Sequence, residues 1–283
     1  FIGTIIIFSM VLFVFRFPTI KSVGNIKSFS KESFISINNI FFGSLVFSVM
    51  LGVTYPLIYE YLYNQKISVG APFYNAIFVP IVVIACIFLF FSIDSKWQRT
   101  IRIPFFAAPS FFSTILAIAS TFLSTYFFEI TSASIIISLF AGFLLIFRYL
   151  IEISISFTRK KYLNPFSAVA HFSLGLLIIS IALNSVLSTE RAINIKINQS
   201  ETYKDLNIFF QDIRVINKSN HDAIKANFVI RDNDLNSYTL SPEKRKYFTR
   251  GQITTETAIH VSLLRDIYLT IGDQLDDGSW IVN

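Results

Sequence analysis

Six stretches of the sequence are almost free of charged residues, and this pattern constrains the fold more than any other feature. They cover residues 1–15, 40–62, 73–93, 104–128, 132–151 and 165–187. Most of them reach the ~20 residues that an α-helix needs to cross ~30 Å of hydrocarbon. The pattern predicts a membrane-embedded, all-α helical bundle of about six spans. We expect the short first stretch to be the end of a spanning helix that starts before residue 1.

Positive charge alternates between the two ends of these stretches. After the first, third and fifth stretches, the connections hold eleven basic residues: Arg16, Lys21, Lys27, Lys31, Lys96, Arg99, Arg102, Arg148, Arg159, Lys160 and Lys161. The other short connections hold one, Lys66. Because short cytoplasmic loops collect lysine and arginine, this bias favours a membrane protein over a soluble all-α core. It also predicts that the segment after residue 187 lies outside the cytoplasm.

The character of the chain changes after residue 187. Residues 188–283 hold twelve Lys or Arg and thirteen Asp or Glu, and apolar residues alternate with polar ones. Stretches rich in β-branched and aromatic residues predict strands at 193–198, 206–215, 226–231 and 257–271. We therefore expect a transmembrane helical region over 1–187 and a small, mainly-β extracytoplasmic domain over 188–283.

Charge, cysteine content and the absence of common motifs exclude several functions. The net charge of +6 resides in the loops between the apolar stretches, so it reflects topology and contact with membrane lipid rather than nucleic-acid binding. Cys86 is the only cysteine, which excludes a CxxC pair within this chain. The sequence has no phosphate-binding glycine loop, HExxH motif or nucleophile elbow. No catalytic residue is assigned.

His171 is the histidine that falls in an apolar stretch, and it is the main candidate for chemistry. An ionisable side chain at such depth usually faces a partner inside the bundle. Its neighbours three and four positions away are Ser167, Ala168, Leu174 and Gly175. Three of these are small, so a planar macrocycle could lie beside His171, with the imidazole as axial ligand to iron. The alternative, which the residues alone favour, is that the small side chains receive a neighbouring helix.

Charged residues and prolines at the edges of the apolar stretches are interpreted as features of helix ends. We expect Glu152 at the membrane interface, and we expect Arg148 to extend its long side chain to the headgroups. Pro56 should kink or end the helix over 40–62.

The C-terminal region offers fewer candidates. His221 and His260 are expected to be surface or structural histidines. The charged run 242–247 predicts a solvated turn. The alternative is a docking face, or a pair of opposite charges, Arg245 with Glu256, that braces the domain on the membrane half.

Several short motifs follow one another along nearly the whole chain. They are Ser30-Lys31-Glu32-Ser33, Asn38-Asn39, residues 52–56, 66–75, 170–172, 242–247, 255–259 and 266–268, and Trp280. In this order they resemble the C-terminal half of the CcmF family, the haem lyase component of bacterial and mitochondrial cytochrome c maturation. The stretches 67–75 and 242–247 are the most specific, because so many adjacent positions agree.

The resemblance implies a function outside the membrane. Members of the family join haem to apocytochrome c, receive it from the chaperone CcmE and act with CcmH-type thiol-handling partners. The protein would lie in the bacterial or mitochondrial inner membrane as a multi-pass protein, with its C-terminal domain extracytoplasmic.

The resemblance also implies roles for residues. Family members hold a b-type haem between two membrane histidines, and His171 matches the later one. The other axial histidine and the Trp-rich segment that presents the substrate haem are expected before residue 1, so this chain alone should be inactive. The motifs mark further residues as structural or docking candidates: Glu32, Asn38, Asn39, Pro72, Asn75, Glu243, Arg245 and Glu256.

Two other functions stay open. One is a non-catalytic assembly scaffold whose C-terminal domain is a docking surface. The other is a transporter subunit with an extracytoplasmic binding domain, which broken helices and paired buried charges would favour. Pro56 and Pro80 offer breaks, but the sequence indicates no buried ion pair to accompany them.

Overall fold

The computed structural model describes residues 2–19, 26–65, 67–99, 108–159, 165–232, 236–249, 251, 253–262 and 265–283. Among the loop residues used to predict topology, Lys21, Lys66, Arg102, Lys160 and Lys161 lie outside these ranges, as does the start of the stretch 104–128. The chain divides into two compact units, Phe1–Leu187 and Ser188–Asn283.

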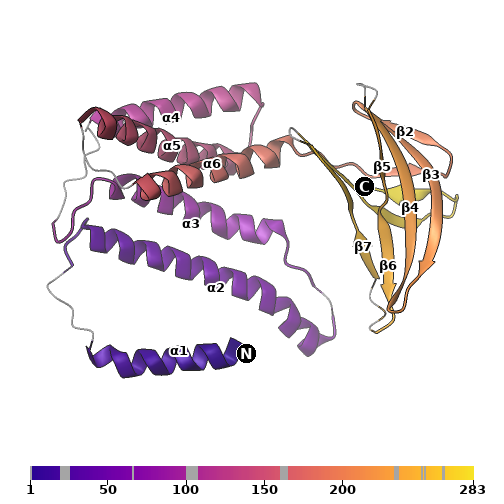
Figure 1. Ribbon diagram of the computed structural model, residues 1–283, viewed down its shortest axis with the longest axis horizontal. Helices are drawn as coiled ribbons and strands as arrows, with labels where there is room; N and C mark the ends of the chain where they lie inside the picture. The colour runs from indigo at the N-terminus through magenta and orange to yellow at the C-terminus, as the bar shows by residue number, and fades with distance from the viewer. Residues whose placement is uncertain are drawn as a thin grey trace. The chain divides into compact units, whose positions relative to one another are not determined.

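Helices build the first unit (Figure 1). They are α1 (Ile2–Arg16), the 3₁₀ turn η1 (Phe17–Thr19), α2 (Lys31–Tyr63), α3 (Ala71–Ser92), α4 (Ala108–Phe127), α5 (Ala133–Arg159) and α6 (Pro165–Leu187). Five of them, α2 to α6, are long and apolar enough to cross a membrane, and α1 is shorter. The predicted helical membrane bundle is confirmed, and the chain has the architecture of a multi-pass membrane protein.

Helix α2 is longer than its apolar stretch predicts. It begins at Lys31 instead of residue 40, because the Ser30 hydroxyl accepts a hydrogen bond from the Ser33 amide and caps the helix. Asn38 and Asn39, expected ahead of the span, therefore lie within the helix. Pro56 does not end α2, which continues to Tyr63.

The packed part of the helical unit centres on α5. Its buried side chains, such as Leu145, share one cluster with Cys86 of α3, Ala117 of α4 and Ala168 of α6. Cys86 is a buried packing residue, as predicted. Many large apolar side chains of α1, α2 and α4 are exposed. Such surfaces suit contact with lipid tails, which are as apolar as leucine.

Strands build the second unit, as predicted. A six-stranded antiparallel sheet has the order β2-β3-β4-β6-β7, with β5 paired to β4, and a three-stranded sheet has the order β1-β11-β10. Strands β8 and β9 pair as a hairpin. The bounds are β1 (Ile193–Ile195), β2 (Ser200–Tyr203), β3 (Leu206–Asn217), β4 (His221–Asp232), β5 (Ser237–Leu240), β6 (Glu243–Tyr247), β7 (Ile253–Glu256), β8 (Ala258–Val261), β9 (Asp266–Leu269), β10 (Ile271–Gln274) and β11 (Trp280–Val282).

One apolar core joins the two larger sheets. Phe210 and Phe228 stack across the β3–β4 pair with ring centroids 4.4 Å apart. Ile195, Ile271 and Val282 from the three-stranded sheet belong to the same buried cluster. Two sheets sharing one core make a β-sandwich. The stretch 257–271, predicted as one strand, instead contributes β8, β9 and the start of β10.

Candidate functional site

His171 lies on α6 between two polar or aromatic neighbours. Its ring centroid is 4.9 Å from that of Tyr149 on α5, at an interplanar angle of 36°. Its Nδ1 lies 3.4 Å from the Ser167 hydroxyl oxygen, one helical turn away. The imidazole is half-buried. In the part of the chain that the structure describes, no group of three or more His, Cys, Asp or Glu side chains could hold a metal ion.

Part of the flat patch predicted beside His171 is occupied by α5. A Cβ on Gly175 would lie 2.9 Å from both the Gly142 carbonyl oxygen and Ile146 Cγ1. Ala168 is buried in the cluster that α5 organises. This side of α6 therefore receives a neighbouring helix, because small residues let two backbones approach closely.

The other side of His171 is open. Ser167 and Leu174 are exposed on the same face of α6, and no hydrogen bond to Nε2 of His171 is found among the described residues. Within the described residues, the side of α6 that carries Ser167 and Leu174 is uncovered and is where a planar haem could lie, whereas α5 covers the side of Gly175. The residues present fit one axial ligand, His171 through Nε2.

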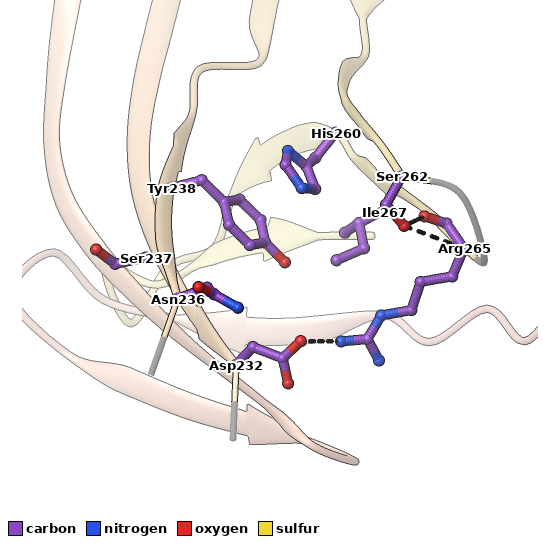
Figure 2. A pocket seen from close by; sticks show the side chains of 8 residues that line it. All are labelled: Asp232, Asn236, Ser237, Tyr238, His260, Ser262, Arg265 and Ile267. Carbon is purple, nitrogen blue, oxygen red and sulfur yellow. Dashed lines mark hydrogen bonds and ion pairs between the residues drawn. The ribbon is translucent and has the colours of Figure 1, made fainter. Parts of the chain in front are cut away.

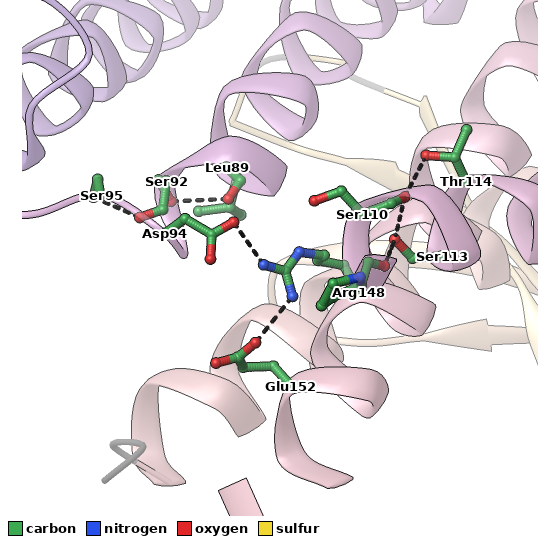
Figure 3. A network of polar contacts seen from close by, with 10 residues as sticks. Leu89, Ser92, Asp94, Ser95, Ser110, Ser113, Thr114, Arg148 and Glu152 are labelled. Atoms are coloured by element: carbon green, nitrogen blue, oxygen red, sulfur yellow. Dashed lines mark hydrogen bonds and ion pairs between the residues drawn. The ribbon is translucent and has the colours of Figure 1, made fainter. Parts of the chain in front are cut away.

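Arg148 is buried inside the helical unit instead of extending to the headgroups. Its side chain is 1% exposed, and it donates hydrogen bonds to Asp94 (2.8 Å) and to Glu152 (3.1 Å) (Figure 3). Asp94 follows α3, whereas Arg148 and Glu152 lie one turn apart on α5. The expectation that Arg148 extends to the headgroups was wrong, because the two carboxylates hold the guanidinium inside the bundle. Glu152 is buried against Arg148 as well.

Glu32 links α2 to the segment after α3. Its two carboxylate oxygens accept the backbone N–H of Gln98 at 2.9 and 3.2 Å. The amide of Lys31 donates to the carbonyl of Lys96 at 3.1 Å. Glu32 thus makes a structural contact. Asn38 and Asn39, which lie further along α2, are exposed.

Two of the motifs that carry the family resemblance contact each other. Gly52 on α2 is buried, and a Cβ at this position would collide with the ring of Tyr74 on α3. Pro72 occupies the first turn of α3, where its missing N–H has no cost. Asn75 is exposed in the next turn. The motifs at 52–56 and 66–75 therefore form one α2–α3 contact.

The charged run at 242–247 forms strand β6 rather than a turn. Glu243 lies opposite Glu256 on β7 and opposite Lys225 on β4. Arg245 contacts Glu243 at 2.9 Å and Glu256 at 3.4 Å, so the predicted pair of opposite charges exists, within the β-unit. The Arg245 hydrogen bond lowers the pKa of Glu243. Glu243 and Glu256 are like charges directly opposite each other, and Arg245 offsets their repulsion by pairing with both.

A polar cavity of about 370 Å³ lies near one end of the β-unit (Figure 2). The rings of Tyr238 and His260 stack there, 3.9 Å apart. Arg265 forms ion pairs with both Asp205 and Asp232 and lowers the pKa of Asp205. These five residues come from the β2–β3 turn, from β4, β5 and β8, and from the position just before β9. Their contacts join these elements. No sequence pattern predicted this arrangement.

His221 is a structural histidine. It is buried, its Nδ1 lies 2.7 Å from Asn220 Oδ1, and its ring is 5.1 Å from that of Tyr247.

Comparison with known proteins follows the division into units. Residues 186–283 match the family model described as the CcmF C-terminal beta-sandwich. The cytochrome c-type biogenesis proteins CcmF of Pseudomonas aeruginosa and Escherichia coli are 26% and 27% identical, in each case over 97% of this chain. The C-terminal unit matches the CcmF family model, and the chain as a whole is similar to CcmF proteins.

The match covers less than half of those relatives. The chain spans 43% of the length of the P. aeruginosa and E. coli proteins. A solved structure, cytochrome c haem lyase CcmF, aligns with 91% of this chain and 42% of its own, with a TM-score of 0.62 and 16% identity. This likeness shows that the chain shares the fold of the aligned part of that structure.

Proposed function

We propose that this chain is part of a haem lyase subunit that acts in cytochrome c maturation, and that His171 is one axial ligand of a membrane-bound b-type haem. The main support is His171 itself, a half-buried histidine on a spanning helix with an open side next to Nε2. The names of the relatives, cytochrome c-type biogenesis proteins, support the pathway.

The proposal includes a setting and partners. The helices lie in a bacterial or mitochondrial inner membrane, and the β-sandwich is extracytoplasmic. The haem chaperone CcmE, CcmH-type thiol-handling proteins and apocytochrome c are the proposed partners. A bound b haem would supply an electron that keeps the incoming haem iron reduced. The chain's other histidines, His221 and His260, lie in the β-unit, so the second axial histidine must come from elsewhere in the protein.

A haem spectrum tests this proposal. The full-length protein and its His171→Ala variant are purified in detergent, and reduced-minus-oxidised pyridine haemochrome spectra are recorded. The expected result is a b-type haem that copurifies with the parent and is lost from the variant. His260→Ala, in the β-unit, is the matched control and should retain the haem. A variant of His171 that keeps the full haem content would refute the ligand assignment.

One observation favours the second candidate, a transporter subunit. Arg148 with Asp94 and Glu152 is the kind of buried ion cluster that transport sites contain. Against this, α2 and α3 continue through Pro56 and Pro80, so neither proline breaks its helix. The haem spectra also discriminate the two candidates. A parent protein without haem would favour the transporter subunit, which does not predict loss of haem from the Arg148→Met variant.

A further inference from the structure

Two side chains restrict how the imidazole of His171 can turn. The Tyr149 ring lies against it from α5, with centroids 4.9 Å apart. The Ser167 hydroxyl approaches Nδ1 at 3.4 Å from the preceding turn of α6. Tyr149 packs against the imidazole ring, and Ser167 contacts its Nδ1. Tyr149 therefore restricts the orientation of the ring, and Ser167 affects which nitrogen carries the proton.

The face contact fixes the ring plane. Rotation of histidine about its last side-chain bond is soft, with broad preferred angles. A neighbouring ring blocks part of that rotation. Tyr149 can restrict this rotation because it is itself buried, with only 3% of its surface exposed, and so cannot move aside easily. Its chain neighbour Arg148 is held by Asp94 and Glu152, which fixes this turn of α5.

The edge contact bears on the tautomer, because the Ser167 hydroxyl can accept a hydrogen bond from Nδ1–H or donate one to a bare Nδ1. Neutral histidine carries its proton on one nitrogen, and the hydrogen bond made by the other nitrogen decides which of them binds a metal. Histidines that bind metals usually donate their second N–H to an oxygen. With Nδ1–H donating to Ser167, the lone pair of Nε2 is left for iron.

We infer that Tyr149 and Ser167 are positioning residues that hold the His171 imidazole in one plane and in the Nδ1–H tautomer. This inference rests on the proposed function, in which His171 binds haem iron. It assigns a task to two residues outside the motifs that carry the family resemblance. The Tyr149 contact is made by the ring, so Tyr149→Phe should keep both the contact and the orientation of the His171 imidazole.

Nitrogen NMR tests the tautomer without haem. The chain has three histidines, so ¹⁵N-histidine labelling of the haem-free chain in detergent gives few signals, and His171→Ala assigns the relevant one. The Nδ1–H form should dominate in the parent. Ser167→Ala should shift the tautomer ratio about three- to fivefold toward Nε2–H, the change expected for loss of one ordinary hydrogen bond. An unchanged ratio would overturn the role of Ser167.

Electron paramagnetic resonance tests the ring plane in the haem-loaded, full-length protein. The g values of low-spin ferric haem depend on the orientation of the axial imidazoles. Tyr149→Leu should broaden or shift them, while Tyr149→Phe should match the parent. Phe147 is a partly buried aromatic of α5 that packs against the same cluster, so Phe147→Leu is the control and should change nothing.

The two proposals fail separately. If His171→Ala keeps the b haem, the ligand assignment fails. If His171→Ala loses the haem but Tyr149→Leu leaves the g values unchanged, the positioning role alone is refuted. Should Tyr149→Leu not fold, Tyr149→Met removes the ring while filling more of its volume, and g values identical to those of the parent would equally count against the role of the Tyr149 ring.

Discussion

The guanidinium of Arg148, just past the middle of α5, donates a 2.8 Å hydrogen bond to Asp94 beyond the end of α3. Since Arg148 is 1% exposed, this bond connects two helices across the interior of the unit. Glu152 provides the second carboxylate. Breaking a buried ion pair by removing one partner leaves an uncompensated charge, which is more costly than losing an exposed pair.

Arg148→Met should therefore strongly destabilise the helical unit. We expect a loss of about 3–5 kcal/mol, since two carboxylates would stay near an apolar side chain. Thermal unfolding of the detergent-purified protein, followed by circular dichroism, measures it. The control is Arg214→Met, which removes an ion pair to Asp212 on the surface of the β-unit and should cost less than about 1 kcal/mol. Equal shifts in Tm would contradict burial of Arg148.

The approach of Gly142 and Gly175 predicts that neither tolerates a side chain. In Gly175→Ala the new methyl group would lie 2.9 Å from the Gly142 carbonyl oxygen, and a backbone atom cannot swing aside. Helices α5 and α6 must separate, at a cost of about 1–3 kcal/mol. Gly43→Ala is the matched control, because nothing lies within 4 Å of its Cβ position. Alanine there should be neutral or stabilise α2 by up to about 1 kcal/mol.

Gly52 and Tyr74 should behave as a coupled pair. Gly52→Ala displaces the Tyr74 ring and should lower Tm, while Tyr74→Leu removes the obstacle. In the double variant the cost of the alanine should largely disappear. A double-mutant cycle measures the interaction, for which about 0.5–3 kcal/mol is typical of residues in contact. Strict additivity would show that the two motifs do not meet.

The Glu243–Arg245 pair predicts an acid-sensitive β-unit. Because Arg245 lowers the pKa of Glu243 below its ordinary 4.5, the pair stabilises the folded state above that value. This stability is lost as pH falls through the lowered pKa of the folded state. Arg245→Met should remove that part of the acid-induced fall in Tm between about pH 6 and pH 3. Lys246→Met, on the exposed side of β6, should leave the pH dependence unchanged.

The sequence predicted the parts of this fold that depend on hydrophobic pattern. Helices α2 to α6 follow apolar stretches long enough to cross hydrocarbon, and the β-unit begins where polar and apolar residues start to alternate. His171 could be singled out because an ionisable residue in an apolar stretch is rare. Its neighbour Tyr149 could not, since their contact depends on the packing of α5 against α6.

Contacts between distant segments escaped prediction. Asp94 and Arg148 are 54 residues apart, and each alone looks like an interfacial charge. The one local signal was the four-residue spacing of Arg148 and Glu152, which places opposite charges on one face of a helix. Strand β6 was read as a turn, because its pairing depends on charged partners supplied by β4 and β7 rather than on β-propensity.

The length of α2 has a geometric consequence. With 33 residues at 1.5 Å per residue, the helix is about 50 Å long, roughly 20 Å more than the hydrocarbon thickness. The N-terminal turns that carry Lys31, Glu32, Asn38 and Asn39 are polar, so the surplus length falls at that end. At about 5.4 Å per turn, this surplus amounts to nearly four helical turns, so the polar end of α2, joined to Gln98 through Glu32, extends beyond the lipid tails.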